Sequence, residues 1–128
     1  MMTAIYVHDT RAIPYSIAIA SSIKPIETRT RDVFGRFVGQ RVLIIRTRDG
    51  HPADVVGSAF IAGKKFYSAA ELEDLRNQTL IPPGSMYDCK QRGKWGYTMT
   101  NAVLFSEPVP LSDFQIASKT RSYATIAA

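Results

Sequence analysis

The sequence is poor in the residues that build disulfide frameworks and metal sites. Its 128 residues include one cysteine, Cys89, and two histidines, His8 and His51. A single cysteine excludes an internal disulfide framework, which fits a reducing compartment. The spacing of these three residues matches no zinc-binding pattern. We therefore expect neither a metal ion nor a cofactor.

The sequence also lacks a long apolar run. Residues 1–9 have neither the basic start nor the apolar stretch of a signal segment. Nowhere does the chain approach the roughly 20 consecutive apolar residues of a membrane-spanning helix. We expect a soluble, cytoplasmic protein with no membrane partner.

Several catalytic motifs are absent as well. Gly93 and Lys94 lack the preceding glycine and the following Ser or Thr of a phosphate-binding P-loop, and no Gly-x-Ser-x-Gly elbow occurs. His51 lies near Asp54, but we interpret this pair as part of a loop and not of a catalytic triad. Cys89 lies in a basic loop, yet no base that would activate the thiol accompanies it. P-loop, serine-hydrolase and cysteine-nucleophile chemistry are therefore set aside.

The composition supports one small domain. A chain of 128 residues that is 45% hydrophobic can bury one core but has little material for a second. Pro108 and Pro110 end regular strand pairing, because proline cannot donate to a ladder. We predict a domain over residues 1–112, followed by a C-terminal tail over residues 113–128.

Hydrophobic periodicity and turn residues predict an order of elements. We expect a first strand at residues 5–8, and a helix that starts at Pro14 and turns Ile13, Ile17 and Ala20 towards the core. The later expected elements are strands at 42–45, 55–62, 95–99 and 102–105, a second helix at 69–77, and a long loop at 79–94.

Three of these segments carry specific local signals. Ser68 followed by Glu71 forms a capping box, which marks the start of the second helix. The continuous apolar run at residues 42–45 is typical of a strand buried on both faces. Loops as long as residues 79–94 often form functional lids in compact domains.

The net charge of +5 is concentrated in one window. Residues 24–48 hold seven basic residues and two acidic ones, so the rest of the chain is neutral overall. Arginine makes paired hydrogen bonds to phosphate oxygens, and a basic cleft attracts polyanions. The alternative is a solvated strand face decorated with arginines, and the charge pattern alone does not decide between the two.

The start of this window packs acidic, basic and hydroxyl groups into a segment that favours a strand. In a strand of residues 24–31, the side chains of Glu27, Arg29 and Arg31 share one face. Thr28 lies on the opposite face with its neighbours Ile26 and Thr30, and Lys24 lies at the entrance. We predict a functional site here.

The same segment resembles a known family. A helix beginning at Pro14-Tyr15, then Ile23-Lys24-Pro25-Ile26-Glu27-Thr28-Arg29, a loop with glycine and a hydrophobic strand look like the ASCH domain of the PUA-like superfamily. The resemblance implies an α+β fold, a small PUA-like mixed β-barrel of five or six strands with two helices. Ser22 stands where that family usually has glycine, which implies a slightly different exit from the helix.

The resemblance also implies two roles for the segment. Some ASCH proteins are amidohydrolases of N4-acetylcytidine that use a lysine, a threonine three residues later and a distant glutamate. Lys24 matches the lysine, but Glu27 stands three residues later and Thr28 follows it. Glu27 would act as a general base if burial raised its pKa, with Lys24 or Arg29 stabilising an oxyanion. Otherwise Glu27 forms an ion pair with Lys24 or Arg29.

Two functions therefore stay open. The first is binding of RNA or of a modified nucleoside, with arginines on phosphates and aromatic rings stacking on bases. The residues expected for binding are Arg29, Arg31, Arg36, Tyr87, Trp95 and Tyr97. The second is a small hydrolase of N4-acetylcytidine-type nucleosides, or a ribonuclease, with Lys24, Glu27 and Thr28 in the catalytic site.

Overall fold

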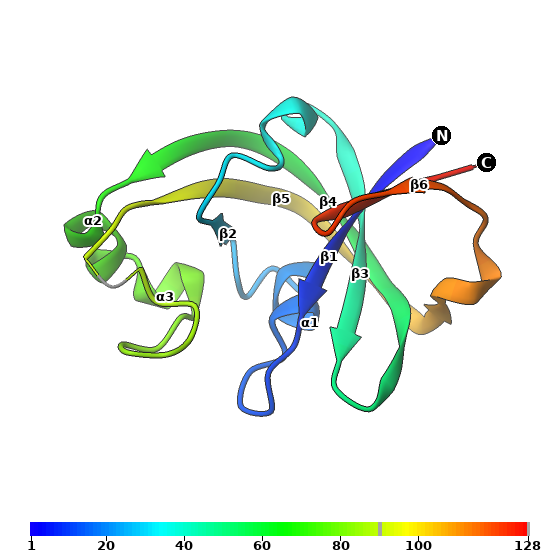
Figure 1. The fold of residues 1–128 in the computed structure, drawn as a ribbon, viewed down its shortest axis with the longest axis horizontal. Coiled ribbons are helices and arrows are strands. Elements are labelled where there is room, and N and C mark those ends of the chain that lie inside the picture. The colour runs from blue at the N-terminus through cyan, green and yellow to red at the C-terminus, as the bar shows by residue number, and fades with distance from the viewer. Residues whose placement is uncertain (90, 128) are drawn as a thin grey trace.

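A curved mixed sheet with short helices makes up the structure, a computed structural model that describes residues 1–89 and 91–127 (Figure 1). The strands are β1 (Met2–His8), β2 (Ile26–Arg29), β3 (Arg41–Arg48), β4 (His51–Tyr67), β5 (Lys94–Pro110), β6 (Ile116–Lys119) and β7 (Tyr123–Ile126). The helices are α1 (Tyr15–Ala20), α2 (Ala69–Asp74) and α3 (Arg76–Thr79), with 3-10 turns at η1 (Gly35–Phe37) and η2 (Leu111–Asp113). No helix within these residues has the length and apolar character needed to cross a membrane.

The sheet is open, with strand order β2-β5-β4-β3-β1-β7-β6. All neighbouring strands in it are antiparallel except β1 and β3, which are parallel. The α+β mixed architecture is as predicted, but the closed barrel of five or six strands and two helices is not. The described residues form seven strands and three α-helices, and β2, which has only four residues, pairs with β5 alone.

The strands β4 and β5 form a long antiparallel pair that bends the sheet. We call this pair the β4–β5 hairpin, although α2 and α3 lie in the segment that connects its strands. Each strand has 17 residues, whereas the sequence predicted one shorter strand at 55–62 and two at 95–99 and 102–105. The pairing register of the hairpin shifts at three places. Because such shifts increase local twist, they allow the strands to continue where an ideal ladder would end.

Both faces of β3 are buried, as the apolar run predicted. Val42 and Ile44 belong to the larger core cluster, which α1 covers through Ile19. Leu43 and Ile45 belong to a second cluster on the other face. The alternation of the four side chains places two layers of core on one central strand.

The C-terminal segment supplies part of the second cluster. Residues 113–128, expected to be a tail, contribute β6 and β7. Strand β7 pairs with β1, and the pairing runs from Met2 opposite Ile126 to Ile5 opposite Tyr123. The two chain ends therefore lie close together in Figure 1. Ala124 and Ile126 are buried while their neighbours are half-buried, which is the alternation of a strand with one covered face.

The second helix starts as predicted. The Ser68 side chain accepts from the Glu71 backbone N–H, and the Glu71 side chain accepts from the Ser68 backbone N–H, so the capping box is complete. The helix then breaks at Leu75 into α2 and α3. These helices lie at the end of the β4–β5 hairpin that is distant from the chain ends (Figure 1).

The exit from α1 sets the position of Lys24. Ser22 adopts a φ of 66°, so it takes the left-handed conformation that glycine adopts without strain. The expected change in the helix exit is therefore absent, and serine accepts the strain instead. The backbone N–H groups of Ile23 and Lys24 both donate to the carbonyl of Ala18, at 2.9 Å each, which ends the helix and turns the chain towards β2.

Replacing Ser22 by glycine should stabilise the protein. The substitution relieves the left-handed strain and should raise the free energy of unfolding by about 0.5–1 kcal/mol, measured by chemical denaturation. Ser21→Gly is the matched control, because Ser21 has a φ of −97° and its hydroxyl donates to the Ile17 carbonyl at 2.6 Å. That control should be destabilising, and a loss of stability in both variants would contradict the interpretation of Ser22.

Candidate functional site

A pocket of about 430 Å³ lies between β1 and β2. Its volume is in the range of small-molecule binding sites. The walls combine residues from strands, from α1 and from the loop that precedes β5. The lining residues are Tyr6, Val7, His8, Tyr15, Lys24, Glu27, Thr28, Arg29, Thr30, Thr47, Ile81, Met86, Tyr87, Asp88, Lys94 and Arg121.

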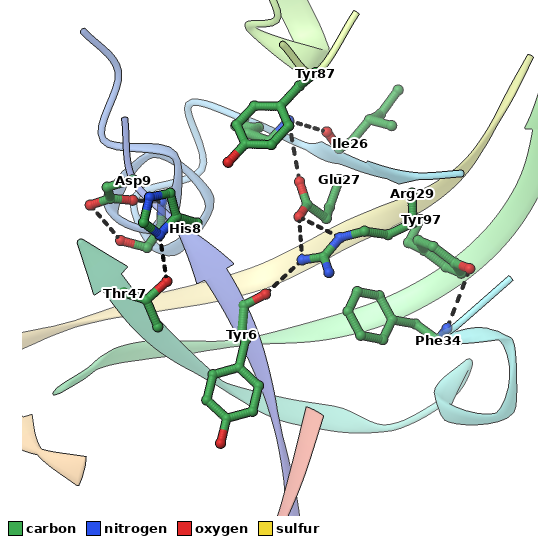
Figure 2. A network of polar contacts seen from close by, with 12 residues as sticks. Tyr6, His8, Asp9, Ile26, Glu27, Arg29, Phe34, Thr47, Tyr87 and Tyr97 are labelled. Carbon is green, nitrogen blue, oxygen red and sulfur yellow. Dashed lines mark hydrogen bonds and ion pairs between the residues drawn. The ribbon is translucent and has the colours of Figure 1, made fainter. Parts of the chain in front are cut away.

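The pocket occupies an unpaired seam of the sheet. Strand β2 is the edge strand, and β1 pairs with β3 over residues 4–8 but with β7 only over residues 2–5, so among the residues that the structure describes the second edge of β1 has no strand partner beyond Ile5. One side-chain bridge crosses the seam, because Arg29 Nη2 donates to the backbone carbonyl of Tyr6 at 2.6 Å (Figure 2). A closed barrel would place backbone pairing where this molecule has a cavity.

Lys24 is the anchor at the base of the pocket. Its side chain is 1% exposed, and its Nζ donates to the Ile26 carbonyl at 2.9 Å and to the Thr79 carbonyl, and lies 3.5 Å from Glu27 Oε1. Three acceptors therefore meet the three donors of the ammonium group. Burial lowers the pKa of Lys24, and the Glu27 carboxylate offsets only part of that effect.

Glu27 is shared between two cations. Its Oε2 accepts from Arg29 Nη2 at 2.8 Å and from Arg29 Nε at 3.2 Å (Figure 2). Its Oε1 faces Lys24. Burial opposes the charged form, but the guanidinium of Arg29 and the ammonium of Lys24 outweigh it, so the pKa of Glu27 is lowered.

This geometry favours the ion-pair interpretation of Glu27 over the general-base hypothesis. That role required burial to raise the pKa of the carboxylate, and the neighbouring cations lower it instead. Both oxygens are also engaged by cations. A carboxylate in this state is a weak proton acceptor, so the ion-pair interpretation describes Glu27.

Thr28 lies in the same pocket as Glu27, although strand alternation predicted opposite faces. The pocket extends around the free edge of β2 and so meets side chains from both faces. Within residues 1–89 and 91–127, the buried Thr28 Oγ1 has no hydrogen-bond partner. The three residues predicted to be catalytic therefore line one cavity: Lys24, Glu27 and Thr28.

The predicted arginines separate in the structure. Arg29 lines the pocket. Arg31 is exposed and does not line it, and Arg36 is exposed and donates to the Tyr123 hydroxyl at 2.9 Å. Arg46 forms an ion pair with a carboxylate of β4. The basic window is therefore not a single groove, because side-chain direction distributes its charge over several surfaces.

The predicted aromatic residues separate in the same way. Tyr87 lines the pocket, edge to face with Tyr15 at 5.7 Å between ring centroids. Tyr97 is fully buried in the core with its hydroxyl donating to Asp32 at 2.7 Å, so its ring is not open to a ligand. Trp95 is half-buried and packs on another ring of the hairpin, outside the pocket.

Lys94 is the main pocket residue that sequence reasoning missed. It is 6% exposed, and its Nζ donates to the Tyr87 carbonyl at 2.9 Å. Burial lowers the pKa of Lys94. Its sequence context, between Gly93 and Trp95 at the end of a polar loop, gives no signal of burial. Tyr6, Tyr15 and other lining residues come from elements whose approach to β2 depends on the tertiary fold.

The chemistry available in the pocket is hydrogen bonding and positive charge. Within the described part of the chain, no three His, Cys, Asp or Glu side chains gather in a way that could hold a metal ion. At the mouth, His8 Nδ1 lies 2.9 Å from Thr47 Oγ1 (Figure 2). The cationic groups suit the stabilisation of an anion or of a developing oxyanion.

Removal of the Glu27 charge should destabilise the protein strongly. Glu27→Gln leaves the buried Lys24 and the partly buried Arg29 without a carboxylate, so the free energy of unfolding should fall by about 3–5 kcal/mol in a denaturation experiment at neutral pH. Glu73→Gln is the control, because Glu73 is 62% exposed in its own pair with an arginine. Its effect should be below about 1 kcal/mol, and equal effects would contradict the buried network.

The same carboxylate should contribute to the acid sensitivity of the fold. The pKa of Glu27 is lowered from 4.5 in the folded state, so its stabilising contribution is present above that value and is lost as the pH falls below it. Between about pH 5 and pH 3, the stability of Glu27→Gln should therefore decline less steeply than that of the wild type. If thermal denaturation shows that wild type and Glu27→Gln lose stability equally over this pH range, groups other than Glu27 cause the acid sensitivity.

Comparisons with known proteins support the fold. No protein-family model and no curated protein matches this sequence. The structure is similar to the crystal structure of ASCH from Zymomonas mobilis, with a TM-score of 0.71 and 16% identity over 98% of this chain and 87% of that one. Two single-substitution variants of that protein match with TM-scores of 0.70 and 0.67, at 16% identity, over 98% of this chain and 88% and 90% of theirs. The chain therefore has the fold of an ASCH domain.

Proposed function

We propose that the chain binds a nucleoside unit, either a free modified nucleoside or one nucleotide of single-stranded RNA, in the pocket between β1 and β2. The observation that carries the proposal is the presence of fixed charged groups and tyrosine rings in one cavity. Lys24, Glu27 and Arg29 supply the charges, while Tyr15 and Tyr87 supply the rings.

These groups match the two recognisable parts of a nucleoside. A base has a flat face that stacks on aromatic rings, and an edge of donors and acceptors that hydrogen-bonds with polar side chains. Lys24 is held by buried hydrogen bonds and Arg29 by partly buried ones, so neither needs a large rearrangement before a ligand arrives. Such preorganised groups lose little conformational entropy on binding.

The geometry favours a pocket over an extended groove. Of the residues expected for binding, Arg29 and Tyr87 line the cavity, whereas Arg31, Arg36 and Trp95 do not. A single nucleoside fits a cavity of about 430 Å³. An RNA strand would contribute one unit at a time, with its neighbours outside.

The test compares two aromatic substitutions of the same kind. Tyr87→Ala removes a ring from the pocket and should weaken the affinity for cytidine, N4-acetylcytidine or a short single-stranded RNA by about tenfold or more, measured by titration calorimetry. Trp95→Ala removes a ring outside the pocket and should leave the affinity within a factor of about two. Equal weakening by both variants would indicate an extended groove, and no binding of any probe by the wild type would overturn the proposal.

A second function is supported by the isolated hydroxyl of Thr28. Thr28 Oγ1 has no hydrogen-bond partner in the described part of the chain and lines the same pocket as Lys24, so in this role it would contact the reacting carbonyl, and the cations would stabilise the oxyanion that forms during hydrolysis of an amide. This arrangement fits a small amidohydrolase of N4-acetylcytidine-type nucleosides, and a ribonuclease is the other hydrolase to test. Both enzymes would require a proton acceptor for the attacking group, and because Glu27 is a weak one, another group would have to take that role.

Hydrolysis assays separate the catalytic proposal from simple binding. If the protein is an amidohydrolase, wild type should convert N4-acetylcytidine to cytidine and acetate, and Thr28→Val should lower kcat by about two decades or more while the protein stays folded. A single-stranded RNA substrate in a parallel assay tests the ribonuclease. Absence of turnover with both substrates, together with retained binding, would remove the enzyme and leave the binding module.

A further inference from the structure

The charges that line the pocket are not balanced. Glu27 is shared by Lys24 and Arg29. Asp88 accepts from Arg76 and from two backbone N–H groups of its own loop. Within residues 1–89 and 91–127, no carboxylate oxygen lies within 4.0 Å of Lys94 Nζ, so Lys94 forms no ion pair, and the carboxylates of Glu27 and Asp88 attract it only from farther away.

The unbalanced charge is also buried. Lys94 is 6% exposed, and one backbone carbonyl, that of Tyr87, accepts from its Nζ among the described residues. An ammonium group removed from water costs free energy unless an opposite charge compensates it. The low exposure of Lys94 thus makes an anion the most suitable occupant of the space beside it.

Thr28 adds a second unsatisfied group to the same wall. The residue is 5% exposed, and its Oγ1 has no hydrogen-bond partner in the described part of the chain. A buried hydroxyl that lacks a partner loses the hydrogen bonds it made in water. Lys94 and Thr28 both line the main pocket and also a small adjoining cavity of about 10 Å³.

The pairing register explains why Lys94 and Thr28 are neighbours in the sheet. Thr28 on β2 lies opposite Gly96 on β5, and Lys94 comes two residues before Gly96 on the same strand. Residues two apart on a strand share a face, so Lys94 and Thr28 are diagonal neighbours on one face of the sheet. Diagonal neighbours are about 7–8 Å apart, a span that a lysine side chain covers.

We propose that Lys94 and Thr28 form a subsite for a phosphate group, so that the ligand is a nucleotide and not a neutral nucleoside. The inference rests on the proposed binding function, not on the hydrolase in which Thr28 would contact the reacting carbonyl, and it specifies the ligand class. An ammonium and a hydroxyl together offer charged and neutral donors to phosphate oxygens. The phosphate in turn supplies the negative charge that the free pocket lacks beside Lys94.

The experiment measures how much affinity a phosphate adds. Titration calorimetry of wild type with cytidine, with cytidine 5′-monophosphate and with the 3′-monophosphate should show at least tenfold tighter binding of one monophosphate. Lys94→Met should abolish that difference, so that the variant binds cytidine and both monophosphates with equal affinity. Lys119→Met is the control, because Lys119 is exposed on β6 and does not line the pocket, and it should retain the difference.

Two further variants test the hydroxyl and guard against misfolding. Thr28→Val removes Oγ1 while conserving shape and should reduce the monophosphate preference several-fold, whereas Thr28→Ser should retain it. Without ligand, Lys94→Met should melt at a temperature equal to or above that of wild type, because it removes an uncompensated buried charge. A marked loss of stability in Lys94→Met would overturn the view that its charge is uncompensated.

The outcomes distinguish the subsite from the proposed function. Equal affinities of wild type for cytidine and both monophosphates would overturn the subsite and leave nucleoside binding intact. Binding of none of these probes, nor of a single-stranded tetranucleotide RNA, would overturn the proposed function and the subsite together. Retention of the phosphate preference in Lys94→Met would also overturn the subsite. Tighter binding of the tetranucleotide than of either monophosphate, if lost in Lys94→Met, supports the subsite with RNA as the source of the phosphate.

Discussion

One carboxylate held between two cations organises the region where the sheet fails to close. Glu27 neutralises Lys24 on one side and Arg29 on the other. Lys24 also ties β2 to the carbonyl of Thr79 at the end of α3, and Arg29 ties it to the carbonyl of Tyr6 on β1. The network therefore fixes a four-residue edge strand that has backbone pairing on one side only.

The same network explains why a cavity exists at this place. Backbone pairing between β1 and β2 would fill the seam, because paired strands lie about 4.8 Å apart. A side-chain bridge from Arg29 is longer and leaves the adjacent space to the pocket. Buried ion pairs contribute little net stability, since desolvation opposes the Coulomb attraction. Their main effect here is to hold polar groups at fixed positions around a space that a ligand can enter.

Local signals predicted the features that depend on neighbouring residues. The capping box at Ser68, the apolar run of β3 and the grouping of Lys24 with Glu27 are all properties of short segments. The sequence did not predict β7, because two prolines after residue 107 indicated the end of pairing although Ala124 and Ile126 alternate as a strand requires.

The composition of the site depended on long-range geometry. Alternation placed Thr28 and Glu27 on opposite faces of the strand, and it takes no account of a pocket that side chains from both faces line. Lys94 follows a polar loop, and its burial results from contact with Tyr87 across that loop. Charge counting placed Arg31 and Arg36 in the site, but the register and the turn at η1 direct them elsewhere.

The central claim is that the ligand enters the seam between β1 and β2. Amide chemical-shift mapping by NMR with cytidine 5′-monophosphate tests it directly. The largest shifts are predicted on residues 6–8 of β1 and on residues 27–30 at β2, with smaller ones near Lys94 and Tyr87. Shifts confined to the turn around Arg36 and to the hairpin end around Trp95, with residues 6–8 and 27–30 unchanged, would contradict the account.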